Sequence, residues 1–269
     1  MKFVKEILKK ALAILGYEIY HSLEQRVSFD NFSNLVQAYE QRLRESHDLI
    51  PENKNRVKLL ARLIGTLPSE AYFIVYALAK SKEVSGNVCE FGVAQGETSA
   101  LIANEIKSSN KTLHLFDSFE GLPSPTEKDQ LKDDIFSMGS MKAYAGKMSC
   151  PETFVHTRLK EILFPSERYV IHKGFFDQVL RQGTNLPKKI SFAYLDFDFY
   201  EPIKIALDFI HHRATVGSII IVDDYDFFST GVKAAVDEFL EEKNSEMMVY
   251  EFLVPNTQYG HFAILTRKR

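Results

Sequence analysis

Short apolar segments alternate with helical patterns from about residue 86 to the C-terminus. The helical patterns include ETSALIANEIK, EPIKIALDFIHHR and GVKAAVDEFLEE. Strands that are apolar throughout and separated by helices are typical of a parallel sheet covered on both faces. The pattern therefore predicts an α/β domain, in which MMVYEFL and HFAILTRK form a closing antiparallel pair. The preceding predicted strands are NVCEFGV, TLHLFDS, RYVIHKG, ISFAYLDFDFY and GSIIIVDDY.

The first 83 residues carry helical patterns without a strand signal. Within residues 1–20, apolar residues recur at helical spacing and lysines lie largely elsewhere on the wheel, which predicts a basic amphipathic helix. We expect this helix to dock on the protein body or on a second subunit of a homo-oligomer; weak contact with an anionic membrane surface is the alternative. The chain thus divides into a helical extension, residues 1–83, and an α/β domain, residues 84–269. Further helices are predicted from Asp30 through Leu35, Tyr39 and Leu43, over residues 56–64, and from Pro68 and Ser69 onward.

Acidic residues and glycines follow the predicted strands at the point where each strand ends. Parallel sheets bind ligands outside the carboxyl ends of their strands. Several such endings directed to one edge predict a functional site there. The residues concerned are Glu90 and Gly92, Asp117, Lys173 and Gly174, Asp196 and Asp198, and Asp223 and Asp224.

The first strand leads into the pattern E-x-G-x-x-x-G, formed by Glu90, Gly92 and Gly96. The glycines allow a tight turn and a close approach of backbone to ligand. Thr98 then begins a helix, and Asp117 ends the next strand, where a carboxylate can bind ribose hydroxyls. The dinucleotide pattern G-x-G-x-x-G is absent, and an acidic turn suits a cationic sulfonium better than a pyrophosphate. The turn therefore favours S-adenosylmethionine over NAD, and a glycine turn needed only for packing is the alternative.

The later aspartates predict a metal site. Asp196 and Asp198 are two residues apart on a strand, so they face the same side. Asp223 and Asp224 are adjacent and converge only if the chain leaves the sheet at Tyr225. Clustered carboxylates raise one another's pKa unless a cation neutralises them, and oxygen ligands favour Mg²⁺, Mn²⁺ or Ca²⁺. In the alternative interpretation, Asp198 or Asp224 caps a helix or pairs with a lysine.

The chain resembles the macrocin O-methyltransferase family, which methylates sugar hydroxyls on natural products, over roughly residues 86–266. The resemblance implies a Rossmann-like class I methyltransferase fold, with a mostly parallel seven-stranded sheet flanked by helices. It also implies S-adenosylmethionine as methyl donor and Mg²⁺ as a required ion. Its most specific part is DSFEGLP. The segments that carry it are EFGVAQGETS, LFDSFEGLPSP, HKGFF, LDFDFYEP and IIIVDDY.

The family positions imply a set of site residues. Metal ligands are expected at Asp196, Asp223 and Asp224. One departure from the family pattern lies at residues 95–97, where relatives often show a basic residue and paired glycines. The expected cofactor-binding residues are Glu90, Phe91, Gly92, Gly96, Thr98, Asp117, Ser118 and Phe119, with Gly174 and Phe175 near the adenine.

The chemistry expected is an in-line displacement, in which the protein holds an acceptor hydroxyl and a metal lowers its pKa. Asp196 is the predicted catalytic base, with Asp198 and His172 as weaker alternatives. Phe199 stands where catechol-type enzymes carry a lysine. Residues 119–160 are expected to form a lid over the acceptor.

Bulk properties narrow the function further. Lys and Arg number 33 against 36 Asp and Glu, which gives no reason to expect a nucleic-acid partner. No segment reaches the about 20 apolar residues of a membrane span. The two cysteines, Cys89 and Cys150, favour a reducing, cytoplasmic location without a disulfide. The expected acceptor is a small molecule or glycan; a catechol- or phenol-type methyltransferase, an NAD-dependent oxidoreductase and a non-catalytic binding module are the alternatives.

Overall fold

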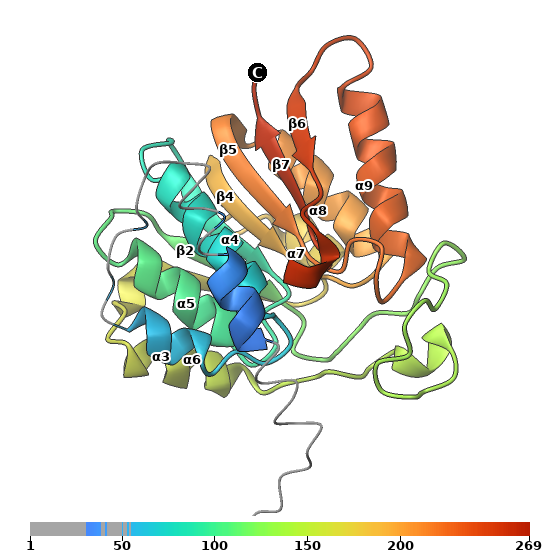
Figure 1. The fold of residues 1–269 in the computed structure, drawn as a ribbon, viewed down its shortest axis with the longest axis horizontal. Helices are drawn as coiled ribbons and strands as arrows, with labels where there is room; N and C mark the ends of the chain where they lie inside the picture. The colour runs from blue at the N-terminus through green and yellow to red at the C-terminus, as the bar shows by residue number, and fades with distance from the viewer. Residues whose placement is uncertain (1–30, 39–40, 42–49, 51–52, 54) are drawn as a thin grey trace, which may run out of the picture.

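In the computed structural model, which describes residues 31–38, 41, 50, 53 and 55–269, seven strands form one sheet (Figure 1). The spatial order is β3-β2-β1-β4-β5-β7-β6, and only β7 runs antiparallel to its neighbours. The predicted sheet and its closing antiparallel pair are confirmed. The strands are β1 (Asn87–Phe91), β2 (Leu113–Asp117), β3 (Tyr169–Lys173), β4 (Ile190–Leu195), β5 (Ala214–Val222), β6 (Tyr250–Leu253) and β7 (Ala263–Arg267).

Helices cover both faces of the sheet, as the apolar strands predicted (Figure 1). On β4, Phe192 and Tyr194 face one core and Ala193 and Leu195 the other, because successive strand residues point to opposite sides. The first core is covered by α4 (Pro68–Lys80) and α5 (Glu97–Ile106), with α3 (Arg56–Leu60) and α6 (Glu152–Glu161) packed on α5. The second core is covered by α7 (Phe176–Gln182), α8 (Tyr200–His211) and α9 (Thr230–Lys243).

The described part of the N-terminal region packs on the α/β domain. The helix α4 begins with Pro68 in its first turn, as predicted, and contacts β4 and β5. The helix α3 ends at Leu60, earlier than the predicted residue 64, and turns follow it up to Gly65, whose φ is +89°. Residues 31–38 are helical. The predicted helix over residues 1–20, together with Asp30, Tyr39 and Leu43, lies outside the described residues.

Within the described residues, no helix combines the length and apolar character needed to cross a membrane. Cys89 lies in the buried core, and Cys150 is also a free thiol.

Strand register brings the functional segments to one edge. Phe91 pairs with Phe116 on one side and with Leu195 on the other, and Leu195 pairs with Val222. The residues that follow these strands therefore meet at the carboxyl edge of the sheet, where the sequence predicted a site.

Candidate active site

The turn after β1 requires glycine. Gly92 has φ +85°, and a Cβ added there would lie 1.8 Å from the carbonyl oxygen of Asp196. Gly96 is the N-cap of α5, with a left-handed φ of +81°. Both are backbone conformations that glycine adopts without a steric penalty. The turn thus places the backbone after β1 directly against the segment that follows β4.

Asp117 lies at this turn, where the sequence placed it. Its Oδ2 accepts hydrogen bonds from the backbone N–H groups of Val93 (2.7 Å) and Ala94 (2.9 Å). Its Oδ1 accepts a third from the N–H of Phe119, at 2.6 Å. The carboxylate therefore orders the turn itself, and a contact with the ribose of a cofactor stays a prediction.

Glu90 is a buried carboxyl group without a partner. Both of its oxygens lack a hydrogen bond, and so does the nearby hydroxyl of Ser99. Burial, together with the charges of Asp117 and Glu97, raises the pKa of Glu90 to about 8, and the Ser99 hydroxyl partly opposes the rise. An unpaired buried carboxyl group beside a ligand turn suits a cationic ligand, because a positive charge would supply the missing partner.

The other predicted cofactor residues differ in whether they lie beside the turn after β1 or direct their side chains into the protein interior. Gly174 donates its N–H to the carbonyl oxygen of Asp117 at 3.0 Å, so the segment containing Gly174 and Phe175 lies beside the turn. Ser118 is engaged in a local turn with residues 120 and 121. The side chain of Phe91 is buried in the core, and the hydroxyl of Thr98 shares a 3.1 Å hydrogen bond with Thr66. The structure thus directs the side chains of Phe91 and Thr98 into the protein interior.

The departure from the family pattern at residues 95–97 has a structural explanation. Glu97 forms an ion pair with Arg158 of α6, and Arg158 Nε also donates to the carbonyl oxygen of Gln95 at 2.6 Å. Both contacts hold α6 against the turn. Sequence reasoning missed this pair, because the partners lie far apart in the chain.

Three aspartates converge at the ends of β4 and β5. Carboxylate oxygens of Asp196, Asp198 and Asp224 all lie within 4.8 Å of one another. Asp198 and Asp224 have positive φ values, 60° and 54°, which turn the chain sharply just after each strand. Asp223, which the family positions implied as a ligand, is not in this group. Its Oδ2 instead accepts a 2.5 Å hydrogen bond from the hydroxyl of Tyr194.

The three carboxylates repel one another in a partly enclosed space. Burial raises the pKa of Asp196, Asp198 and Asp224 well above the usual range, and the charges of neighbouring acids, including Asp223, add to this rise. At Asp198 a hydrogen bond with Asp224 partly opposes the rise. A dication would remove the repulsion, and carboxylate oxygens are the donors that Mg²⁺, Mn²⁺ and Ca²⁺ prefer. The donor set of Asp196, Asp198 and Asp224 therefore fits the kind of ion that the sequence predicted, and a metal contact of Asp223 stays a prediction.

A buried polar network lies beneath the aspartates. The Tyr194 hydroxyl is 3.3 Å from Oε1 of Glu70 on α4 and 3.4 Å from Oγ1 of Thr66. Because Thr66 also contacts Thr98, the network links the start of α5 to Asp223. In the sequence, the polar Glu70 near the start of the largely apolar helix α4 was the only signal for this network.

His172 is buried on the sheet between another histidine and an aromatic ring. Its Nε2 lies 3.0 Å from Nδ1 of His114, its ring stacks on Phe116 at 4.4 Å, and Asn87 contacts the other nitrogen of His114. This buried pair on the sheet argues against His172 as the base.

The segment expected to be a lid leaves the protein body and returns to it. Its base is closed by hydrogen bonds from Leu122 N–H to the Lys147 carbonyl and from Gly146 N–H to the Leu122 carbonyl, both 2.9 Å. Within the loop, Met141 and Tyr144 pack on Phe199 and Phe228, which flank the aspartates in sequence. The loop thus lies against the acid-bearing segments, whereas α6, at its C-terminal end, packs on α5.

The chain has the class I methyltransferase fold: a parallel sheet with a reversed β7, a glycine turn after β1 and an acidic residue ending β2. The sequence model of the macrocin-O-methyltransferase (TylF) family matches residues 30–251. The chain therefore belongs to this family and is an S-adenosylmethionine-dependent O-methyltransferase.

Solved structures share the fold at low sequence identity. The O-methyltransferase NovP is 20% identical with a TM-score of 0.61, over 75% of this chain and 81% of its own. The calicheamicin methyltransferase CalS11 is 21% identical with a TM-score of 0.59, over 92% and 94%. An O-methyltransferase from Bacillus cereus in complex with SAH is 14% identical with a TM-score of 0.51, over 87% and 100%. No curated protein matches the chain.

Proposed function

We propose that this enzyme methylates a hydroxyl of a sugar or another vicinal diol, with a divalent cation held by Asp196, Asp198 and Asp224. The observation that carries the proposal is the position of this carboxylate group beside the turn after β1, residues 92–96, which we call the donor turn. The N–H of Asp196 donates to the carbonyl of Phe91 at 2.7 Å, immediately before Gly92. Acceptor and donor would thus meet at adjacent strand ends.

On the donor side, the proposed task of the protein is to bind and orient S-adenosylmethionine. The sulfonium is already an activated methyl donor, so the main requirement is alignment with the incoming oxygen. The unpaired carboxyl group of Glu90 is proposed to face the positive charge of the donor, and Asp117 the ribose. Glycine at residue 92 lets the backbone of this turn lie directly against the Asp196 carbonyl, so the donor residues and the carboxylate group are neighbours.

On the acceptor side, a bound divalent cation would lower the pKa of the hydroxyl and could chelate two neighbouring oxygens. Of the three carboxylates, Asp196 is adjacent to the donor turn, so we assign it the role of proton acceptor. The loop over residues 122–147 packs against the acid-bearing segments and is proposed to exclude water from them. These residues therefore supply alignment, a base and a closed site.

A sugar is proposed as the methyl acceptor because of the family to which the chain belongs and the acceptor named for CalS11. The family is named for macrocin O-methylation, and the apo structure of CalS11 describes that enzyme as a TDP-rhamnose 3′-O-methyltransferase. At 20% identity, the likeness to CalS11 supports the fold alone. The acid group is independent support for a diol, because two adjacent oxygens can share one cation.

The proposal is tested by methyl transfer from radiolabelled S-adenosylmethionine to panels of sugars and catechols. We expect transfer to sugar diols that EDTA abolishes and Mg²⁺ restores. Calorimetry should show binding of S-adenosylhomocysteine and none of NADH. Activity that is indifferent to chelation would refute the metal, and transfer confined to catechols would refute the sugar.

A further inference from the structure

Asp129, in the loop over residues 122–147, is a buried carboxylate that no step proposed above uses. Its Oδ1 accepts hydrogen bonds from the N–H of Tyr200 at 2.7 Å and from the hydroxyl of Ser229 at 3.1 Å. Its Oδ2 accepts two more from Thr126, through the N–H at 2.7 Å and the hydroxyl at 2.8 Å. The side chain is therefore fully engaged.

The two partners of Oδ1 follow the two acid-bearing segments. Tyr200 is the first residue of α8, shortly after Asp198, and Ser229 is the N-cap of α9, shortly after Asp224. A carboxylate also suits this place electrostatically, because both helix N-termini carry partial positive charge. One oxygen atom thus connects the ends of both segments.

The packing around Asp129 leaves no room for adjustment. A Cβ added to Gly231 would lie 1.8 Å from Oδ1 of Asp129, so glycine is required on the α9 side. Asp129 itself is 5% exposed. The carboxylate is therefore held in one position between α8 and α9.

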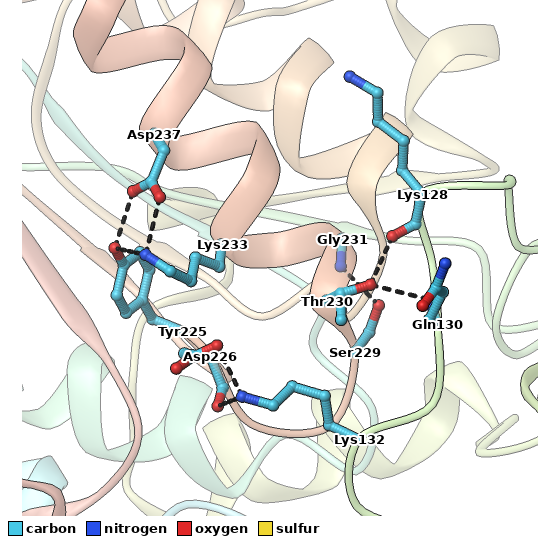
Figure 2. Close-up of polar contacts among 10 residues, drawn as sticks. All are labelled: Lys128, Gln130, Lys132, Tyr225, Asp226, Ser229, Thr230, Gly231, Lys233 and Asp237. Carbon is cyan, nitrogen blue, oxygen red and sulfur yellow. Dashed lines mark hydrogen bonds and ion pairs between the residues drawn. The ribbon is translucent and has the colours of Figure 1, made fainter.

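Leu131 forms an isolated antiparallel bridge with Ser229, the residue before α9, and Figure 2 shows the side chain of Thr230 in contact with Lys128 and Gln130. Thr230 N–H donates to the Gln130 carbonyl at 3.0 Å, and its hydroxyl donates to the Lys128 carbonyl at 2.6 Å. Lys132 Nζ contacts Asp226 Oδ1 at 2.7 Å. Residues 126–132 therefore join the loop to the segment after β5.

We propose that Asp129 is a positioning residue that sets the separation between Asp198 and Asp224. These two aspartates have left-handed backbones, and such conformations persist only where the surroundings hold them. The hydrogen bonds from Tyr200 and Ser229 to Asp129 supply that restraint, because they fix the residues that follow Asp198 and Asp224 in the chain. The metal part of this inference rests on the proposed function.

The test compares Asp129→Asn with Asp134→Asn. Asp134 lies in the same loop and accepts hydrogen bonds from Met138, Gly139 and Tyr144, all of the loop itself. Both variants lose one charge, but only Asp129 is tied to α8 and α9. Mn²⁺ affinity is measured by electron paramagnetic resonance, S-adenosylhomocysteine affinity by calorimetry, and amide exchange in metal-free protein by mass spectrometry.

For Asp129→Asn we expect Mn²⁺ affinity to fall roughly 10–100-fold, as for other residues that orient metal ligands. We expect S-adenosylhomocysteine affinity to stay unchanged and amide exchange to rise over 196–200 and 224–231. Asp134→Asn should match the wild type in all three measurements. Equal Mn²⁺ affinity and equal exchange in the two variants would overturn the proposal.

Two further outcomes stay decisive. If Asp129→Asn does not fold, Ser229→Ala removes one bond to the carboxylate together with the N-cap bond from Gly231, so Mn²⁺ affinity and exchange over 196–200 are the measurements that apply to it. If the wild type binds no Mn²⁺, the metal part of the proposed function is wrong. Exchange over 196–200 and 224–231 then decides alone whether Asp129 positions the two segments.

Discussion

The hydroxyl of Tyr194 donates a hydrogen bond to Asp223 Oδ2 over 2.5 Å, and this contact gives two adjacent aspartates different environments. The second oxygen of Asp223 accepts the N–H of Asp224 at 2.8 Å. The backbone of Asp224 is left-handed, with φ 54°, and its carboxylate lies in the group with Asp196 and Asp198. From the sequence, both residues were expected as metal ligands through the family positions, with a helix cap or a lysine pair as the alternative for Asp224.

The first prediction separates these two residues. Asp224→Asn should weaken Mn²⁺ binding far more than Asp223→Asn, because only Asp224 contributes an oxygen to the three-carboxylate group. Both substitutions keep side-chain size and remove one charge, so each controls for the other. Electron paramagnetic resonance of Mn²⁺ measures the affinities. The reverse order would return Asp223 to the ligand set.

The second prediction concerns Glu90, whose pKa burial raises to about 8. In the free protein below pH 8 this group holds its proton, whereas a cationic donor favours the ionised form. Binding of S-adenosylmethionine should therefore release a proton near pH 7, and the affinity should increase as the pH rises toward 8. Glu90→Gln should lose the proton release and about 1.5–3 kcal/mol of binding free energy.

Calorimetry in buffers of different ionisation enthalpy measures that proton release. S-adenosylhomocysteine, which lacks the sulfonium charge, serves as the control ligand and should be less sensitive to Glu90→Gln. Identical proton release in the wild type and in Glu90→Gln would remove Glu90 from the donor site.

The third prediction concerns stability at acid pH. Burial lowers the pKa of both His114 and His172 to about 4, and the charge of His172 also lowers that of His114. Their folded-state pKa values lie below the unfolded value of 6.5, so the unfolded chain binds more protons between these limits. The contribution of the pair is complete above pH 6.5 and is lost as the pH falls toward 4, by about 1–3 kcal/mol for each histidine.

Urea unfolding at several pH values measures this loss. The double variant His114→Gln, His172→Gln should show a shallower decline between pH 6.5 and 4 than the wild type. The exposed His212 provides the control, and His212→Gln should leave the slope unchanged. Equal slopes for the double variant and the wild type would contradict the assignment.

The fourth prediction concerns the donor turn. Gly92→Ala and Gly139→Ala both place a side chain at positive φ, +85° and +78°. At Gly139 the added Cβ meets open space, so the variant should lose only about 1–2 kcal/mol of stability. At Gly92 the Cβ clashes with the Asp196 carbonyl, so stability should fall further and S-adenosylhomocysteine binding should be lost. Chemical denaturation and calorimetry check both, and unchanged ligand binding in Gly92→Ala would show that the donor site does not depend on this backbone contact.

Much of the fold could be predicted because its signals are local. Apolar strands such as NVCEFGV and GSIIIVDDY predict burial on both faces, and the antiparallel β6 and β7 were predicted from their own pattern. The placement of Asp117 beside the glycine turn also follows from local order, because parallel neighbouring strands end at one edge. These features need only the strand period and the direction of the chain.

The sequence by itself determined the family, the parallel sheet and the edge at which the acidic residues gather. Only the tertiary structure decided which of those acids meet. Asp198 rather than Asp223 joins Asp196 and Asp224, because Tyr194 from β4 binds Asp223. The Glu97–Arg158 pair and the bonds of Asp129 to α8 and α9 likewise join residues distant in the chain. Such contacts depend on the packing of whole elements, for which local spacing carries no signal.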